Sequence, residues 1–176
     1  MRLARSLDDG AFLGHVLRMH GNELRKASRC GAAIARLTEA AELSHNGKER
    51  GQTLILLARA AGERGNSGLH DDSVAAAPRL MDTAGPSGIL FTPFSLREVR
   101  IRGLMGTGRA AMAAELAQSR PRSGESPAPQ WSAIEAAASA DALSTAGDTS
   151  SAQGLYDEPL SLAVRHRLPH QVQRVV

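Results

Sequence analysis

Side chains large enough to build an extensive hydrophobic core are scarce in this chain of 176 residues. Aromatic residues make up 3% of the sequence, and 30 of the apolar residues are alanines, which bury little surface. Aromatic and branched aliphatic side chains supply most of the buried area that offsets the loss of chain entropy on folding. We therefore do not expect one compact core across the whole chain, but a smaller core with loosely packed surroundings.

Cysteine is nearly absent, with Cys30 as its only occurrence. A single cysteine excludes an intramolecular disulfide and a thiolate metal cluster within one chain. None of the six histidines belongs to a tight cluster with acidic residues, so no metal site is predicted.

Long apolar runs are also lacking. The longest run of large apolar residues, Leu54–Leu57, is far shorter than a bilayer span. Arg2 and Arg5 near the start are not followed by an apolar segment of signal-peptide length. These features predict no association with a membrane and a cytoplasmic location.

Lysine is rare as well, since Lys26 and Lys48 are the only two, and arginine carries nearly all of the positive charge. Residues 1–70 hold 11 basic and 7 acidic side chains, whereas residues 110–176 hold 5 basic and 7 acidic ones. A positive N-terminal half can indicate binding to nucleic acid or to an acidic surface. Because arginine, alanine and glycine have GC-rich codons, nucleotide bias alone can also produce this profile.

The first third of the chain does contain helical periodicity. Apolar residues recur at helical spacing in a first stretch, Phe12, Leu13, Val16, Leu17 and Met19. In a second stretch, Leu24, Ala27, Ile34, Leu37 and Ala41, they recur at intervals of three or four or sums of these. Ser6 and Asp9 resemble a capping box for the first stretch, and Asn22 is predicted to cap the second. Residues 44–47 have the composition of a helix stop, and a third helix is expected from there to about residue 65. We expect a small helical unit over residues 1–65.

The remaining two thirds look less regular. Residues 66–88 mix glycine, serine, aspartate and proline and are interpreted as a linker. Residues 89–119 are predicted to form a strand, a glycine turn and a helix. Residues 120–176 are of low complexity and are expected to be mostly disordered, with a short helix over residues 131–143. The expected fold class is mainly α, with one short strand–Gly-turn–helix element and a largely disordered C-terminal third.

A glycine motif follows the predicted strand. Gly106 and Gly108, with Ala111 after them, match the relaxed dinucleotide-binding pattern G-x-G-x-x-A. Backbone amides in such a turn can approach a pyrophosphate, so Gly106, Thr107 and Gly108 are the candidate cofactor-binding residues. Arginines in the preceding strand and the lack of a second apolar strand ending in an acidic residue favour the alternative, a structural glycine-rich turn.

The same region carries a family resemblance. Residues 88–102, Gly-Ile-Leu-Phe-Thr-Pro-Phe-Ser-Leu-Arg-Glu-Val-Arg-Ile-Arg, resemble the opening segment of the Old Yellow Enzyme-type NADH:flavin oxidoreductases. That segment leads into the first strand of a flavin-binding barrel. FMN or NAD is expected only if this resemblance or the glycine motif holds, and otherwise no cofactor is expected. The Asn-Arg and Pro-Met pairs that follow in the family are missing here. A barrel needs about 250 residues and only 74 follow Arg102, so the resemblance implies a non-catalytic, truncated or remnant protein.

Two other functions remain open. One is a small basic helical module that binds nucleic acid or a partner protein. The residues that would contact phosphates are Arg25, Lys26, Arg29 and Arg36, although glutamates interrupt this basic surface. The other is the product of a spurious open reading frame in GC-rich DNA. None of these alternatives predicts a catalytic residue.

Overall fold

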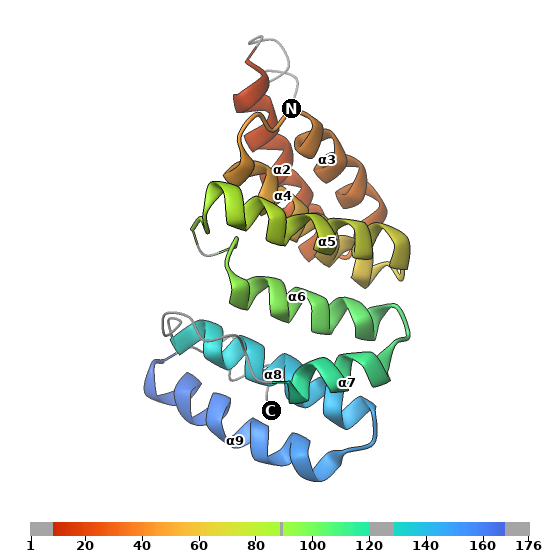
Figure 1. The fold of residues 1–176 in the computed structure, drawn as a ribbon, viewed down its shortest axis with the longest axis vertical. Helices are drawn as coiled ribbons and strands as arrows, with labels where there is room; N and C mark the ends of the chain where they lie inside the picture. Colours follow the sequence, from red (N-terminus) through yellow and green to blue (C-terminus); the bar gives the residue numbers. More distant parts are fainter. Residues whose placement is uncertain (1–8, 89, 120–128, 168–176) are drawn as a thin grey trace. The chain divides into compact units, whose positions relative to one another are not determined.

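The computed structural model describes residues 9–88, 90–119 and 129–167. Within this part of the chain α-helix is the only regular secondary structure, and a single isolated bridge joins Ser87 to Phe91. The helices, shown in Figure 1, are α2 (Gly10–Lys26), α3 (Cys30–Glu42), α4 (Gly47–Glu63), α5 (Ser67–Ala84), α6 (Pro93–Gly106), α7 (Ala110–Gln118), α8 (Pro129–Thr145) and α9 (Thr149–Arg165). The mainly α fold class predicted from the sequence is confirmed.

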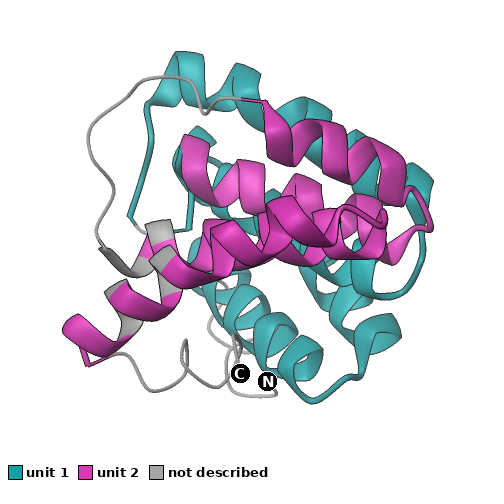
Figure 2. Cartoon of the chain, turned by 90° about the horizontal axis from the view of Figure 1, so that it is seen from below, with its two compact units in different colours: residues 1–92 teal, residues 93–176 magenta. Residues whose placement is uncertain are grey.

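The chain divides into two compact units, coloured separately in Figure 2. The N-terminal unit comprises residues 1–92 and the C-terminal unit residues 93–176. In each unit consecutive helices pair into two hairpins, α2 with α3 and α4 with α5 in the first unit, α6 with α7 and α8 with α9 in the second. The second hairpin packs on the first, through α3 and α4 in the N-terminal unit and through α6, α7 and α8 in the C-terminal unit.

Leucines and one aromatic ring form the core of the N-terminal unit. Ala33 and Leu37 of α3 pack against Leu56 and its neighbours on α4. The ring of Phe91 is fully buried against Gly51, where an added Cβ would overlap it. Glycine on α4 therefore makes the space that admits the largest buried side chain of this unit.

Alanine dominates the core of the C-terminal unit. Ile101 and Leu104 of α6 pack with Ala113 of α7 and with Ala138 and Ala142 of α8. Alanine carries a single methyl group, so this interface buries less apolar area per residue than one built of leucines would.

Two helix starts differ from the prediction. Asp9 is itself the N-cap of α2, since its carboxylate accepts the amide of Phe12 at 3.0 Å, and Ser6 lies outside the described residues. Asn22 lies inside α2, which continues to Lys26, so it does not cap the next helix. The predicted stop at residues 44–47 is confirmed, because Asn46 caps α4 and accepts the amide of Glu49 at 2.8 Å.

The region interpreted as a linker is helix α5. Asn66 caps it by accepting the amide of Leu69 at 3.1 Å. Its buried side consists of His70, Ser73 and Ala77, spaced by three and four residues. A search for large apolar residues cannot detect a stripe made of a histidine, a serine and an alanine.

The predicted strand before the glycines is wrong, because residues 93–106 form helix α6. Pro93 stands at its first position, where a missing amide hydrogen costs nothing. Four of its large apolar residues, Leu96, Val99, Ile101 and Leu104, are buried, and their spacing indicates a helix that has packing contacts on more than one side.

The expected disorder of the C-terminal third is wrong for residues 129–165, which form α8 and α9. The short helix predicted over residues 131–143 is confirmed, within the longer α8. Residues 120–128 and 168–176, for which disorder was also predicted, lie outside the described residues. Alanine is the best helix former, so the alanine-rich stretch after Trp131 favours helix once a partner helix can bury it.

Candidate functional site

One turn recurs at the tip of every hairpin in the described part of the chain. At its centre is a residue with positive φ: Ser28 (58°), Gly65 (77°), Gly108 (77°) and Gly147 (91°). The amide of the next residue donates to a carbonyl five positions back in all four turns: Arg29 to Leu24, Asn66 to Ala61, Arg109 to Leu104 and Asp148 to Leu143, at 2.8–2.9 Å. This is the Schellman motif, which ends one helix and leads directly into the next.

The four hairpins also share a pair of buried residues twelve positions apart. One lies seven residues before the turn centre and its partner five residues after it: Gly21 and Ala33, Ala58 and His70, Ile101 and Ala113, Ala140 and Ala152. In the second hairpin the pair meets directly, because His70 Nδ1 lies 3.1 Å from the carbonyl of Ala58. The described part of the chain therefore contains four copies of one two-helix repeat, two in each unit.

The repeat was not predicted from the sequence. The shared positions hold glycine, alanine, isoleucine or histidine. Most of these residues are small, but no single residue type occurs in all four copies. The detectable signal was the spacing of Gly65, Gly108 and Gly147, each of which follows a helical stretch and precedes another. Repeats of this kind have periods of about 34–47 residues, to which those spacings belong.

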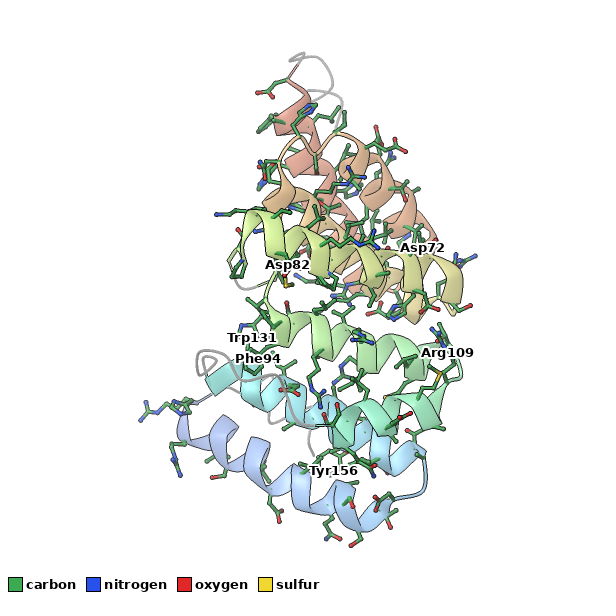
Figure 3. All side chains as sticks on the ribbon, viewed as in Figure 1. Asp72, Asp82, Phe94, Arg109, Trp131 and Tyr156 are labelled. Carbon is green, nitrogen blue, oxygen red and sulfur yellow. The ribbon has the colours of Figure 1, made fainter. Side chains whose placement is uncertain are left out.

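Of the candidate cofactor residues, Gly106 is the last residue of α6, and Thr107 and Gly108 lie in the turn between α6 and α7, where Figure 3 labels Arg109. The amides of Thr107, Gly108 and Arg109 donate to carbonyls of α6 at 3.0, 3.0 and 2.8 Å. The hydroxyl of Thr107 donates to the carbonyl of Gly103 at 2.7 Å. A pyrophosphate would need the same amides, so this geometry accounts for the glycines as a helix end.

The four candidate nucleic-acid residues lie in the first hairpin, and most have acidic partners. Arg25 pairs with Glu63 across two helices. Lys26 pairs with Glu23 at 2.8 Å and Arg36 with Glu39 at 3.3 Å. Arg29 is exposed at the N-cap of α3. Three of the four positive charges are thus balanced locally, which weakens the attraction for phosphate.

The lone cysteine lies beside one of these ion pairs. The Cys30 thiol donates to Glu63 Oε2 at 3.6 Å. Burial raises the pKa of the Cys30 thiol, and the neighbouring carboxylate of Glu63 raises it further, against a smaller opposite effect of Arg25. A thiol held in its protonated form is a poor nucleophile. We therefore interpret Cys30 as a structural residue in contact with Glu63.

Arg97 connects three helices of the C-terminal unit. Its guanidinium pairs with Glu135 of α8, and both side chains are only 12% exposed. It also donates to the carbonyls of Ala117 and Ser119, at 3.1 and 2.7 Å, at the end of α7. One side chain therefore satisfies a carboxylate and the final carbonyls of a neighbouring helix.

A second polar network joins α6, α8 and α9. Arg102 donates to Glu98 at 2.9 Å and to Asp141 at 3.3 Å. The phenol of Tyr156, labelled on α9 in Figure 3, donates to the other oxygen of Asp141 at 2.7 Å. Burial, followed by this hydrogen bond, raises the pKa of Tyr156 to about 12. These side chains hold one another and orient three helices.

Neither a metal centre nor a membrane span is found in the described residues. No group of three or more histidine, cysteine, aspartate or glutamate side chains there is placed to hold a metal ion. Of the helices in that same part, none combines the length and the apolar character needed to cross a bilayer.

The outer side of α2 carries exposed apolar residues. Phe12 is 44% and Met19 49% exposed, and Val16 lies half-buried between them. Their spacing of four and three residues places all three on one face of the helix. The opposite face, with Leu17 and Gly21, is buried against α3. The sequence pattern placed Phe12, Val16, Leu17 and Met19 in one apolar series, whereas the structure separates them onto two sides.

Comparison of the chain with protein-family models, with curated proteins and with solved structures gave no match. The resemblance of residues 88–102 to the flavin oxidoreductases thus finds no support there. The larger part of that segment belongs to helix α6, whereas the resemblance implied a segment that leads into a barrel strand.

Proposed function

We propose that this chain is a small helical-repeat module that binds a partner protein. The observation that carries this proposal is the fourfold recurrence of one hairpin, with the same turn and the same buried pair. Repeated helical hairpins each pack on their neighbours and leave their outer helix faces free, and such proteins use these faces as binding surfaces.

Two features of the N-terminal unit favour a protein over nucleic acid as the partner. Arg25, Lys26 and Arg36 are paired with glutamates, which reduces the net charge available to phosphates. Phe12 and Met19 expose apolar surface, which suits contact with another protein.

Affinity purification of the full chain from its native cells, followed by quantitative mass spectrometry, tests the proposal. We expect one or a few proteins to be retained in saturable amounts at about 0.2 M salt, where complexes held by 6–10 phosphate contacts have lost about 10³–10⁵ in affinity relative to low salt. The matched control is Gly154→Ala, an exposed helical position where a Cβ meets nothing within 4 Å, and it should retain the same proteins.

Two results would overturn the proposal. One is the absence of any saturable protein partner. The other is recovery of nucleic acid alone, lost both at the higher salt concentration and on Arg29→Ala, which would identify a nucleic-acid-binding module.

A further inference from the structure

The repeat makes the exposed position of Met19 comparable with equivalent positions in other hairpins. Nine residues before the turn centre stand Met19 in α2, Leu56 in α4, Val99 in α6 and Ala138 in α8. Leu56 is 2% and Val99 1% exposed and Ala138 is fully buried, whereas Met19 is 49% exposed. The same repeat position is therefore buried in the other three hairpins and uncovered in the first hairpin.

In the second hairpin of each unit, the residues that cover this position belong to the preceding hairpin. Leu56 belongs to a core cluster with Ala33 and Leu37 of α3. Ala138 belongs to a cluster with Ile101 and Ala113, which lie on α6 and α7. This repeat position is thus the contact point at which one hairpin receives the hairpin before it.

Val16 shows the same relationship one turn earlier. Twelve residues before the turn centre, its equivalents are Thr53, which is fully buried, Leu96, which is 8% exposed, and Glu135, which is 12% exposed and paired with Arg97. Phe12 extends the exposed face of α2 by a further turn. The outer face of α2 therefore has the position of a hairpin-to-hairpin interface and the composition of an apolar one.

We infer that the α2 face, formed by Phe12, Val16 and Met19, docks a helix of a partner protein that lies on α2 as α3 lies on α4. This inference rests on the proposed function and specifies its partner. The docked helix would present a small residue and a leucine at i and i+4, as Ala33 and Leu37 do on α3. Because the docked helix would continue the stack of hairpins, the repeat indicates both where this helix binds and which side chains it presents.

A second copy of this chain fits the α2 face poorly. The stripe of α3 that would be needed, with Ala33 and Leu37, is already buried under α4 in every copy. Helix α5, the other second helix of the N-terminal unit, has a largely polar exposed side that includes Asp72, Arg79 and Asp82. Neither second helix of the N-terminal unit of a second copy thus offers the matching apolar stripe, so the partner proposed is a different protein.

A stapled peptide of residues 29–43 serves as the probe, because it copies α3 with its stripe uncovered. A lactam bridge between positions 35 and 39 lies on the side away from Ala33 and Leu37, and it keeps the peptide helical where a free peptide of this length would be marginal. The peptide is titrated into the full ¹⁵N-labelled chain and followed by proton–nitrogen correlation spectra. We expect saturable shifts confined to α2 and to residues in contact with its outer face.

Two methionine variants provide the decisive comparison. Met19→Glu should weaken peptide binding by about tenfold or more, because it places a carboxylate in an apolar contact. Met112→Glu introduces the same change at a 53% exposed methionine of α7 and should leave binding unchanged. Phe12→Ser is a second variant of the α2 face, and circular dichroism verifies that each variant is folded.

Several results would overturn the inference. They are the absence of saturable shifts, shifts centred away from α2, and equal loss of binding in both methionine variants. A dimer detected by light scattering that becomes monomeric in Met19→Glu would identify a second copy as the occupant. A partner protein that binds wild type and Met19→Glu equally would leave the proposed function standing and overturn only the docking face.

Discussion

The two units pack the same two-helix repeat with different side chains. In the N-terminal unit, leucines on α3 and α4 and the ring of Phe91 fill the space between helices. In the C-terminal unit the interface between α6, α7 and α8 is mostly alanine, and polar side chains link the helices at its edges. Both units have the same helical repeat, so this repeat can be packed with either set of side chains.

The difference shows what an alanine-rich helical repeat requires. Alanine buries little area, and each square ångström of apolar surface contributes only about 25 cal/mol, so such an interface gains less from the hydrophobic effect. Arg97 and Asp141 compensate by connecting helices directly, Arg97 to Glu135 on α8 and Asp141 to Tyr156 on α9. We infer that apolar contacts stabilise the first unit most and directional polar contacts the second.

The largest expected effect is that of Phe91→Ala in the N-terminal unit. Removing a fully buried ring should lower the free energy of unfolding by about 3–5 kcal/mol. Urea denaturation measures it by circular dichroism, which reports both units, and by fluorescence of Trp131, the single tryptophan, which lies in the C-terminal unit. The transition by circular dichroism should shift more than the one by fluorescence.

Gly51→Ala tests the same contact, because its effect on the free energy of unfolding should differ in sign between the wild type and the Phe91→Ala variant. In the wild type the added methyl group overlaps the Phe91 ring and should destabilise the protein. In the Phe91→Ala background the ring is gone, and the same change should stabilise helix α4 by about 0.5–1 kcal/mol. The same sign in both backgrounds would contradict the packing of Phe91 on Gly51.

A smaller loss, about 2–3 kcal/mol, is expected for Arg97→Met in the C-terminal unit. The variant leaves the largely buried carboxylate of Glu135 and two helix-end carbonyls without their donor. Trp131 fluorescence during urea denaturation is the direct measurement, and Arg100→Met, an exposed arginine on the same helix, is the control. If Phe91→Ala and Arg97→Met shift both probes equally, the two units unfold together and their stabilities are not separable.

Tyr156, the single tyrosine, reports the second polar network by titration. Its phenolate absorbance should appear with a pKa of about 12 in the folded chain and about 10 in urea. Because the folded pKa is the higher one, the hydrogen bond stabilises the fold fully below about pH 10. That stabilisation should be lost as the pH rises through the folded pKa.

Tyr156→Phe removes the same hydrogen bond at neutral pH. We expect a loss of about 1–2 kcal/mol, since the acceptor is a carboxylate. A variant as stable as the wild type at neutral pH, together with an ordinary tyrosine titration in the folded chain, would show that Asp141 does not hold α9.

The smallest effect concerns the turn that the units share. Ser28 occupies a left-handed position where the other three turns have glycine. Ser28→Gly should stabilise the chain by about 0.5 kcal/mol, because the relief of backbone strain exceeds the entropy cost of glycine. Gly65→Ser should cost a similar amount or slightly more, measured as the shift of the urea midpoint. Destabilisation by Ser28→Gly, or stabilisation by Gly65→Ser, would show that the first turn is not equivalent to the others.

Local patterns in the sequence were sufficient for part of the fold. The spacing of leucines indicated α2 and α4, and Asn46 marked the end of one helix and the start of the next. Helix α5 was missed because its buried side is His70, Ser73 and Ala77. The predicted strand failed because an alternation from Glu98 to Ile101 is too short to exclude a helix, and both Glu98 and Val99 are buried.

The candidate sites divide in the same way. The sequence correctly indicated a glycine-rich turn at Gly106–Gly108, but only hydrogen-bond partners show that its amides are engaged by α6. The basic residues of the first hairpin are visible in the sequence, whereas the pairing of Arg25 with Glu63 joins residues 38 positions apart. Proposals of ligand binding from either pattern remain predictions.

By itself the sequence determined that the chain is mainly helical, has no intramolecular disulfide, and places apolar residues of α2 at helical spacing. The tertiary structure decided that Leu17 is buried while Met19 is exposed, and that four turns of different composition are one repeat. The physical reason is the range of the interactions. Helix propensity and capping depend on neighbours within one or two turns, whereas burial depends on which helix, distant in the chain, covers each face.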